Sequence, residues 1–270
     1  NRSDWRPFRD PDYTRMRLQL AGRGIDLSLE LVKEAIALRG DENRFDSAIV
    51  WLRDQVQTWD GVPRIDRFYP QYFGTEDTPY TRAVSAYTWT AMAGRVLDPG
   101  HKVDMVPILC SGEGCRKSES IASMVPHREF FVELDLTAKD DDMARLMRGR
   151  LVAELGEMRG LRQREMGALK AFITRRYEHW VPKYKEFAIT FPRRLLFIGT
   201  TNEVEFLSDQ TGRRRWLPMN ITRADTDAIE RDREQLWAEA RERFLDSGVA
   251  FEDAEMLAKD EHGKFEEDHP

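Results

Sequence analysis

The sequence has few cysteines and lacks any long apolar run. Its two cysteines, Cys110 and Cys115, are too few for a disulfide framework and leave no second pair for a zinc cluster. Apolar runs such as 105–110 are far shorter than the roughly 18 residues that indicate a membrane span, and no signal-like apolar N-terminus is present. We therefore expect a cytoplasmic protein with no membrane partner.

The chain also lacks an overall basic excess. Its 270 residues carry a net charge of −6, with 41% hydrophobic residues, a composition typical of a packed globular protein of one or two domains. The charge is uneven, because segment 143–194 has thirteen Lys or Arg and five Glu whereas segment 225–270 has six against sixteen acids. Charge runs are usually solvated helix faces, so only motifs can give the basic segment a function.

Five short apolar runs alternate with helical or polar segments after residue 102. They are 103–110, 130–136, 150–155, 195–200 and 216–221. This alternation predicts an α/β fold with a mostly parallel sheet. We divide the chain into a helical N-terminal module (1–100), an α/β core (101–222), and a C-terminal helix with an acidic tail (223–270). Alternating apolar residues predict a hairpin near 180–191 within the core.

A phosphate-binding loop is indicated directly after the first apolar run, where a strand is followed by SGEGCRKS and the start of a helix. In such a loop, backbone N–H groups surround the phosphates of ATP, the lysine contacts the β- and γ-phosphates, and the next hydroxyl binds Mg²⁺. The predicted nucleotide-binding residues are Gly112, Glu113, Gly114, Cys115, Arg116, Lys117, Ser118 and Glu119. Ser111 and Arg116 stand where glycine is usual, so the loop is either a tolerated variant with slow hydrolysis or an inactive one.

Polar residues follow the later apolar runs in an order that suits nucleotide hydrolysis. Glu154 and Glu157 end the third run, where one carboxylate can hold Mg²⁺ and a second can polarise the attacking water. Asn202 follows the fourth run and can orient that water. Arg214 and Arg215 precede the fifth run and can contact the ATP of a neighbouring subunit. Each residue alone is equally consistent with an ordinary strand end or loop; together they predict one site.

The sequence resembles the virulence-associated protein E (VapE) family of phages and mobile genetic islands, which is similar to superfamily three helicases. The matching segments are 59–64, 76–80, the phosphate-binding loop, 154–157, 170–174, 199–202 and 211–215. The resemblance implies a P-loop NTPase core of RecA-like or AAA+-like type. It implies Lys117 and Ser118 as Walker A, Glu154 and Glu157 as Walker B, Asn202 as sensor, and Arg214 or Arg215 as arginine finger. It further implies a DNA-contacting hairpin near 180–191. The resemblance covers roughly residues 59–221, and residues 1–58 show no motif that we can name.

The function expected first is a DNA-dependent ATPase using ATP and Mg²⁺, a ring-forming helicase in phage or mobile-element replication. Its partners would be single-stranded or forked DNA and a primase. It would also assemble with further copies of itself, for example as a hexamer. In the hairpin, Lys183 and Lys185 share a face and can follow phosphates, while Tyr184 can stack on a base; alternatively the hairpin aromatics pack on the core. A nucleotide-binding interaction module with weak or no hydrolysis is the second function, and a small-molecule kinase the third.

Overall fold

A computed structural model describes residues 8–112, 114–135, 138–156, 163–181, 186–202 and 213–262, without the side chains of 163–166 and 213. The chain forms two compact units, Asn1–Ser47 and Ala48–Pro270. The expected N-terminal module, 1–100, is divided between them. The reason is that helix α4 (Pro79–Leu97) is almost entirely buried in the core of the second unit.

The first unit is a pair of helices, α1 (Asp10–Ala21) and α2 (Leu29–Glu42). Ser28 caps α2, since its Oγ accepts a hydrogen bond from the backbone N–H of Leu31 at 3.1 Å. Among the described residues of this unit, Val32 is the only buried apolar side chain. Burial of apolar surface therefore contributes little to the stability of this helix pair.

The second unit contains most of the regular structure. Its remaining α-helices are α3 (Ser47–Val50), α5 (Lys117–Ser123), α6 (Asp140–Met147), α7 (Gln163–Thr174), α8 (Thr226–Ser247) and α9 (Glu252–Glu261). Its short 3₁₀ or π turns are η2 (Trp51–Gln55), η3 (Ile65–Arg67), η4 (Tyr69–Phe73), η5 (Arg128–Phe130) and η6 (Arg213–Arg215). None of the helices in the described part of the chain has the length and apolar character that a bilayer crossing requires.

A five-stranded parallel sheet forms the centre of the second unit. Its strands are β1 (Val106–Cys110), β2 (Phe131–Leu134), β3 (Val152–Leu155), β6 (Leu196–Thr201) and β7 (Trp216–Asn220), in the order β2-β3-β6-β1-β7. Every adjacent pair is parallel. The predicted α/β class with a parallel sheet is confirmed, and each strand falls within or one residue beyond a predicted apolar run.

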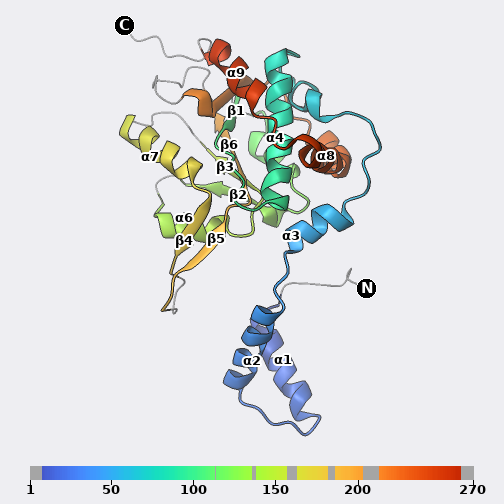
Figure 1. The fold of residues 1–270 in the computed structure, drawn as a ribbon, viewed down its shortest axis with the longest axis vertical. Helices are drawn as coiled ribbons and strands as arrows, with labels where there is room; N and C mark the ends of the chain where they lie inside the picture. The colour runs from blue at the N-terminus through green and yellow to red at the C-terminus, as the bar shows by residue number, and fades with distance from the viewer. Residues whose placement is uncertain are drawn as a thin grey trace. The chain divides into compact units, whose positions relative to one another are not determined.

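Two hydrophobic cores cover the two faces of this sheet. Figure 1 shows α6 and α7 on one side of its strands and α4 and α8 on the other. Leu109 of β1 packs into the core with α4, α5 and α8, whereas Ile108 packs into the core with α6 and α7. Successive side chains of a strand point to opposite faces, so a strand covered on both sides is apolar throughout. The continuous apolar runs in the sequence have this origin.

Two short antiparallel strands, β4 (Tyr177–Trp180) and β5 (Ile189–Pro192), pair between α7 and β6. Trp180 packs edge-on against Phe191 at a ring distance of 5.2 Å and is 8% exposed. Tyr177, on the alternate face of β4, is 53% exposed. The hairpin therefore has one packed face and one face in contact with solvent.

Candidate nucleotide site

The loop between β1 and α5 holds the predicted lysine at the carboxyl edge of the sheet. Lys117 Nζ donates hydrogen bonds to Ser111 O and Ser111 Oγ, both at 2.9 Å, and to Gly112 O at 3.3 Å. It also donates to Asn202 Oδ1 at 2.9 Å. Asn202 directly follows β6, which pairs with β1, so the sheet joins two predicted site residues that lie 85 positions apart.

Glu154 lies on the next strand, β3, and is held by two hydroxyl groups. Its Oε1 accepts hydrogen bonds from Ser118 Oγ at 2.9 Å and from Thr200 Oγ1 at 2.7 Å. The residue is 3% exposed, and its Oε2 is buried with no hydrogen-bond partner among the described residues. A carboxylate with a free buried oxygen beside a hydroxyl group has the ligand types that Mg²⁺ prefers.

Burial raises the pKa of Glu154 above that of an ordinary carboxyl group, because desolvation disfavours the charged form. The hydrogen bonds from Thr200 and Ser118 lower the pKa in part, and the negative charge of Glu133 raises it further. Glu133 stands opposite Glu154 in the pairing of β2 with β3. A cation bound beside Glu154 would stabilise its charged form, so this carboxylate is suited to a metal.

Arg116 occupies the position before the lysine where glycine is usual. Its backbone conformation is one that favours glycine. Its φ of 50° and ψ of 35° lie in the left-handed region, and it is the only non-glycine residue of the described chain with positive φ. Its side chain is 54% exposed and pairs with Glu119 at 2.6 Å. The departure from glycine thus strains the backbone at this position.

Replacing Arg116 by glycine is expected to give a more stable protein than replacing it by alanine, by about 1 kcal/mol. Both changes remove the exposed ion pair with Glu119, but only glycine also relieves the left-handed backbone. Urea unfolding of the two variants measures the difference. An alanine variant as stable as the glycine variant would show that residue 116 is not held in this conformation.

The other predicted site residues differ in burial, and some of them lie outside the described part of the chain. Gly114 has a φ of 89°, which glycine adopts without strain. Cys115 is half-buried against the core, and Glu119 is exposed beside Arg116. Glu113, Glu157, Lys183, Tyr184 and Lys185 lie outside the described residues.

Three residues near Lys117 and Glu154 were not predicted as members of the site. Ser111 supplies two of the lysine's acceptors, although the sequence pattern marks it as a departure from glycine. Thr200 holds Glu154, and Glu133 is its cross-strand neighbour. Thr200 could have been predicted, because it is a polar residue near the end of an apolar run. The role of Glu133 depends on the pairing of β2 with β3, which no local sequence pattern reveals.

Arg214 and Arg215 lie at the opposite edge of the sheet from Lys117. They directly precede β7, whose first residue pairs with the first residue of β1, whereas the phosphate-binding loop follows the last residue of β1. Five residues of strand separate the two edges by about 16 Å. Neither arginine therefore contacts the nucleotide site of its own chain.

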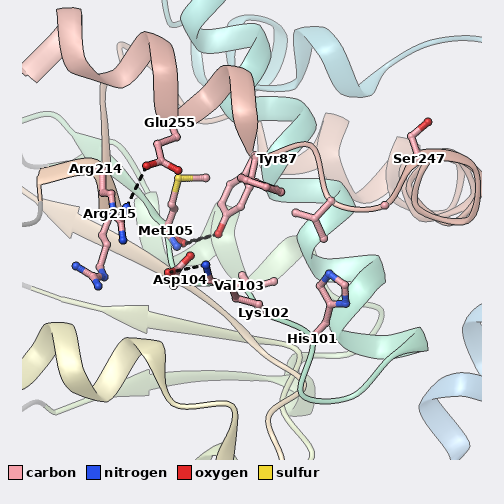
Figure 2. Close-up of a pocket in the computed structure, with 13 residues that line it drawn as sticks. Tyr87, His101, Lys102, Val103, Asp104, Met105, Arg214, Arg215, Ser247 and Glu255 are labelled. Atoms are coloured by element: carbon pink, nitrogen blue, oxygen red, sulfur yellow. Dashed lines mark hydrogen bonds and ion pairs between the residues drawn. The ribbon is translucent and has the colours of Figure 1, made fainter.

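The two arginines line a cavity of about 310 Å³ (Figure 2). Arg214 Nη1 pairs with Glu255 of α9 at 3.5 Å and remains 56% exposed. Arg215 Nε is buried without a hydrogen-bond partner among the described residues. Tyr87, whose hydroxyl donates to Met105 O at 2.8 Å, forms part of the opposite wall. The cavity therefore has both basic and acidic side chains in its lining, and Arg214 is exposed at it.

The sequence matches the family described as virulence-associated protein E-like domain over residues 52–268. No curated protein matches the chain. Among solved structures, it is similar to the apo structure of the NrS-1 C-terminal region (305–718), with a TM-score of 0.52 and 12% identity over 76% of this chain and 53% of that chain. An A-form apo structure of that region gives a TM-score of 0.51 and 12% identity over 74% and 50%. The chain spans about half the length of these structures.

The parallel sheet, with a lysine loop after β1 and polar side chains after β3 and β6, defines an α/β protein with a P-loop-like core. The family match covers most of the second unit. The chain belongs to the virulence-associated protein E-like domain family, which confirms the resemblance found in its motifs.

Proposed function

We propose that this chain is a DNA-dependent ATPase that acts in the cytoplasm as one subunit of a ring-forming helicase, in the replication of a phage or mobile genetic element. The observation that carries the proposal is the meeting of Lys117, Ser118, Glu154 and Asn202 at one edge of the sheet. Lys117 supplies a positive charge for the phosphates, Ser118 and Glu154 supply ligands for Mg²⁺, and the amide of Asn202 can orient a water. Phosphoryl transfer to water requires groups of these kinds.

The residues present suit the binding of Mg²⁺ and ATP. Mg²⁺–ATP would supply the phosphoryl group and neutralise part of its charge. Lys117 would exchange its carbonyl contacts for phosphate oxygens, and Ser118 and Glu154 would hold the metal through the hydroxyl and the unpaired Oε2. Asn202 would orient the attacking water, and Glu157 would accept its proton.

Arg214 and Arg215 would act in this proposal on the nucleotide of a neighbouring subunit. Their position at the amino edge of the sheet supports this role, because a head-to-tail contact would bring that edge to the phosphate-binding loop of the next copy. Repeated head-to-tail contacts close into a ring, and we propose a hexamer that works with a primase.

Mixing two inactive variants is expected to restore part of the ATPase activity. One variant carries Arg214→Ala and Arg215→Ala, and the other carries Glu154→Gln. A site formed by the loop of the first and the arginines of the second would be intact, so the mixture should hydrolyse ATP faster than either variant alone. Subunit exchange is verified by fluorescence transfer between labelled copies. Exchange without any recovered activity would contradict a shared site.

The β4–β5 hairpin is the proposed DNA-binding element. Phe187, beside the paired strands, is 80% exposed and Val181 is 51% exposed, so the hairpin offers apolar surface to a base. Trp180, in contrast, is packed, as the alternative interpretation of the aromatics anticipates.

Replacing Lys183 and Lys185 by glutamate is expected to weaken single-stranded DNA binding equally for all sequences. Each lost phosphate contact reduces the slope of log affinity against log salt concentration by about 0.7 for a single strand. ATP hydrolysis without DNA should stay within about twofold of the parent, because neither lysine is among the residues proposed to hold Mg²⁺–ATP. Fluorescence anisotropy at several salt concentrations measures the slope. An unchanged affinity and slope in the folded variant would exclude these two lysines from the DNA contact.

The second candidate function is a nucleotide-binding interaction module with weak or no hydrolysis. The observation that favours it is the strained, non-glycine backbone at Arg116. Such a module would bind ATP with Mg²⁺ but show no turnover, with or without DNA.

A further inference from the structure

A buried ion pair lies at the base of the hairpin, outside the nucleotide site. Arg193 directly follows β5 and its side chain is 0% exposed, while that of Glu178 on β4 is 4% exposed. The Arg193 Nε donates a hydrogen bond to Glu178 Oε1. Desolvation of two charges costs several kcal/mol per ion, and apolar residues of similar volume often give equal or greater stability. The pair is therefore weak evidence for stability, whereas its contacts fix a specific geometry.

The Arg193 guanidinium contacts two further elements besides β4. Its Nη1 donates to the carbonyl oxygens of Phe172 and Ile173, the latter at 3.2 Å, near the C-terminal end of α7. It also lies over the rings of Phe172 and Phe197, at 4.5 and 5.2 Å from their centroids. Phe197 is the second residue of β6. One side chain thus joins the hairpin, α7 and β6.

The backbone of Arg193 is fixed as firmly as its side chain. Its N–H donates to Arg176 O at 2.9 Å, and its carbonyl accepts from Gly100 N at 2.9 Å and from the buried Arg95 Nη1 at 3.3 Å. The residue therefore cannot shift without moving the base of the hairpin and the segment that leads into β6.

β6 leads from this junction directly to the nucleotide site. Thr200, three residues after Phe197, holds Glu154, and Asn202 follows the strand and holds Lys117. The strand is hydrogen-bonded on both sides, to β1 and to β3. It therefore forms a continuous connection between the Arg193 junction and the two groups that contact the nucleotide residues.

We propose that Arg193, oriented by Glu178, is a positioning residue that couples the hairpin to β6, so that DNA held by the hairpin shifts Thr200 and Asn202 and changes the rate of ATP hydrolysis. This inference rests on the proposed function, in which the hairpin contacts DNA. The pair does not contact nucleotide or DNA; its effect is on the ratio of hydrolysis rates with and without DNA.

The test compares the DNA stimulation of ATP hydrolysis in the parent and in three variants of the full chain. The double variant Glu178→Leu/Arg193→Met fills the space with apolar side chains and should remain folded. Arg193→Lys keeps the charge but loses the planar group that reaches Glu178 and two carbonyls together. Arg231→Lys, at an exposed arginine of α8 that pairs with Asp232, is the control.

Both variants at Arg193 are expected to lose about 2- to 30-fold of the DNA stimulation, the range of coupling changes seen for residues between two sites. Their DNA-free hydrolysis and DNA affinity should stay within about twofold of the parent, because neither variant changes a residue proposed to contact nucleotide or DNA. Arg231→Lys should behave as the parent. Full stimulation in either folded variant would overturn the coupling role alone. A parent that shows no DNA stimulation would overturn the proposed function and the coupling role together.

Discussion

Replacing Lys117 by alanine is expected to reduce ATP hydrolysis about 10²- to 10³-fold, the loss found when one group that stabilises transition-state charge is removed. The ammonium group is held at the mouth of the loop by Ser111, Gly112 and Asn202, so it is in place before the nucleotide arrives. The measurement is steady-state phosphate release at saturating Mg²⁺–ATP.

Lys139→Ala provides a matched control for Lys117→Ala, because Lys139 is an exposed lysine at the start of α6. It should hydrolyse ATP at the rate of the parent. A Lys117→Ala protein with parental turnover would show that phosphate is bound elsewhere.

Replacing Glu154 by glutamine is expected to reduce hydrolysis at least about 10²-fold while making the protein more stable. The amide keeps a carbonyl oxygen for the hydroxyl groups of Ser118 and Thr200 but removes a buried charge. Turnover falls because the neutral amide is a poorer Mg²⁺ ligand than the carboxylate. Stability rises because the folded protein no longer buries the charge of Glu154. Higher melting temperature combined with lower turnover distinguishes a functional carboxylate from a structural one.

The pH dependence of stability follows from the raised pKa of Glu154. Between the ordinary carboxyl pKa and the raised value, the folded state binds more protons than the unfolded state, so the parent loses stability as pH rises through this window. Glu154→Gln should lack that loss. The kcat/KM of the parent should fall as pH decreases through the same window, because kcat/KM reports the free protein, in which the carboxylate becomes protonated before the metal binds.

Glu133→Gln is the control for this pair of experiments. Glu133 stands opposite Glu154 on β2 but is 62% exposed, so it should change turnover by less than about threefold. A Glu154→Gln variant that is less stable than the parent, with unchanged turnover, would contradict the metal-binding role.

The strands could be predicted from the sequence because burial on both faces makes each parallel strand a continuous apolar run. Two helix ends in the structure also follow local chemistry, since Pro79 occupies the first position of α4 and Gly248 follows α8. These features depend on residues within a few positions of each other.

The parts that the sequence could not predict depend on the order of the strands. The place of β6 between β1 and β3 brings Asn202 to Lys117 and Thr200 to Glu154, and no local pattern states that order. Arg214 lies at the edge opposite the loop because β7 runs parallel to β1, so a residue before β7 and a loop after β1 are at opposite ends of the strands. The joint at Arg193 likewise arises from packing among elements that are distant in the sequence.

ATP turnover by the parent protein, measured with Mg²⁺ in the presence and absence of single-stranded DNA, tests the central claim most directly. The account predicts Mg²⁺-dependent hydrolysis that single-stranded DNA accelerates and that Lys117→Ala abolishes in both conditions. Binding of ATP with no turnover in either condition would contradict it and would establish the nucleotide-binding interaction module instead.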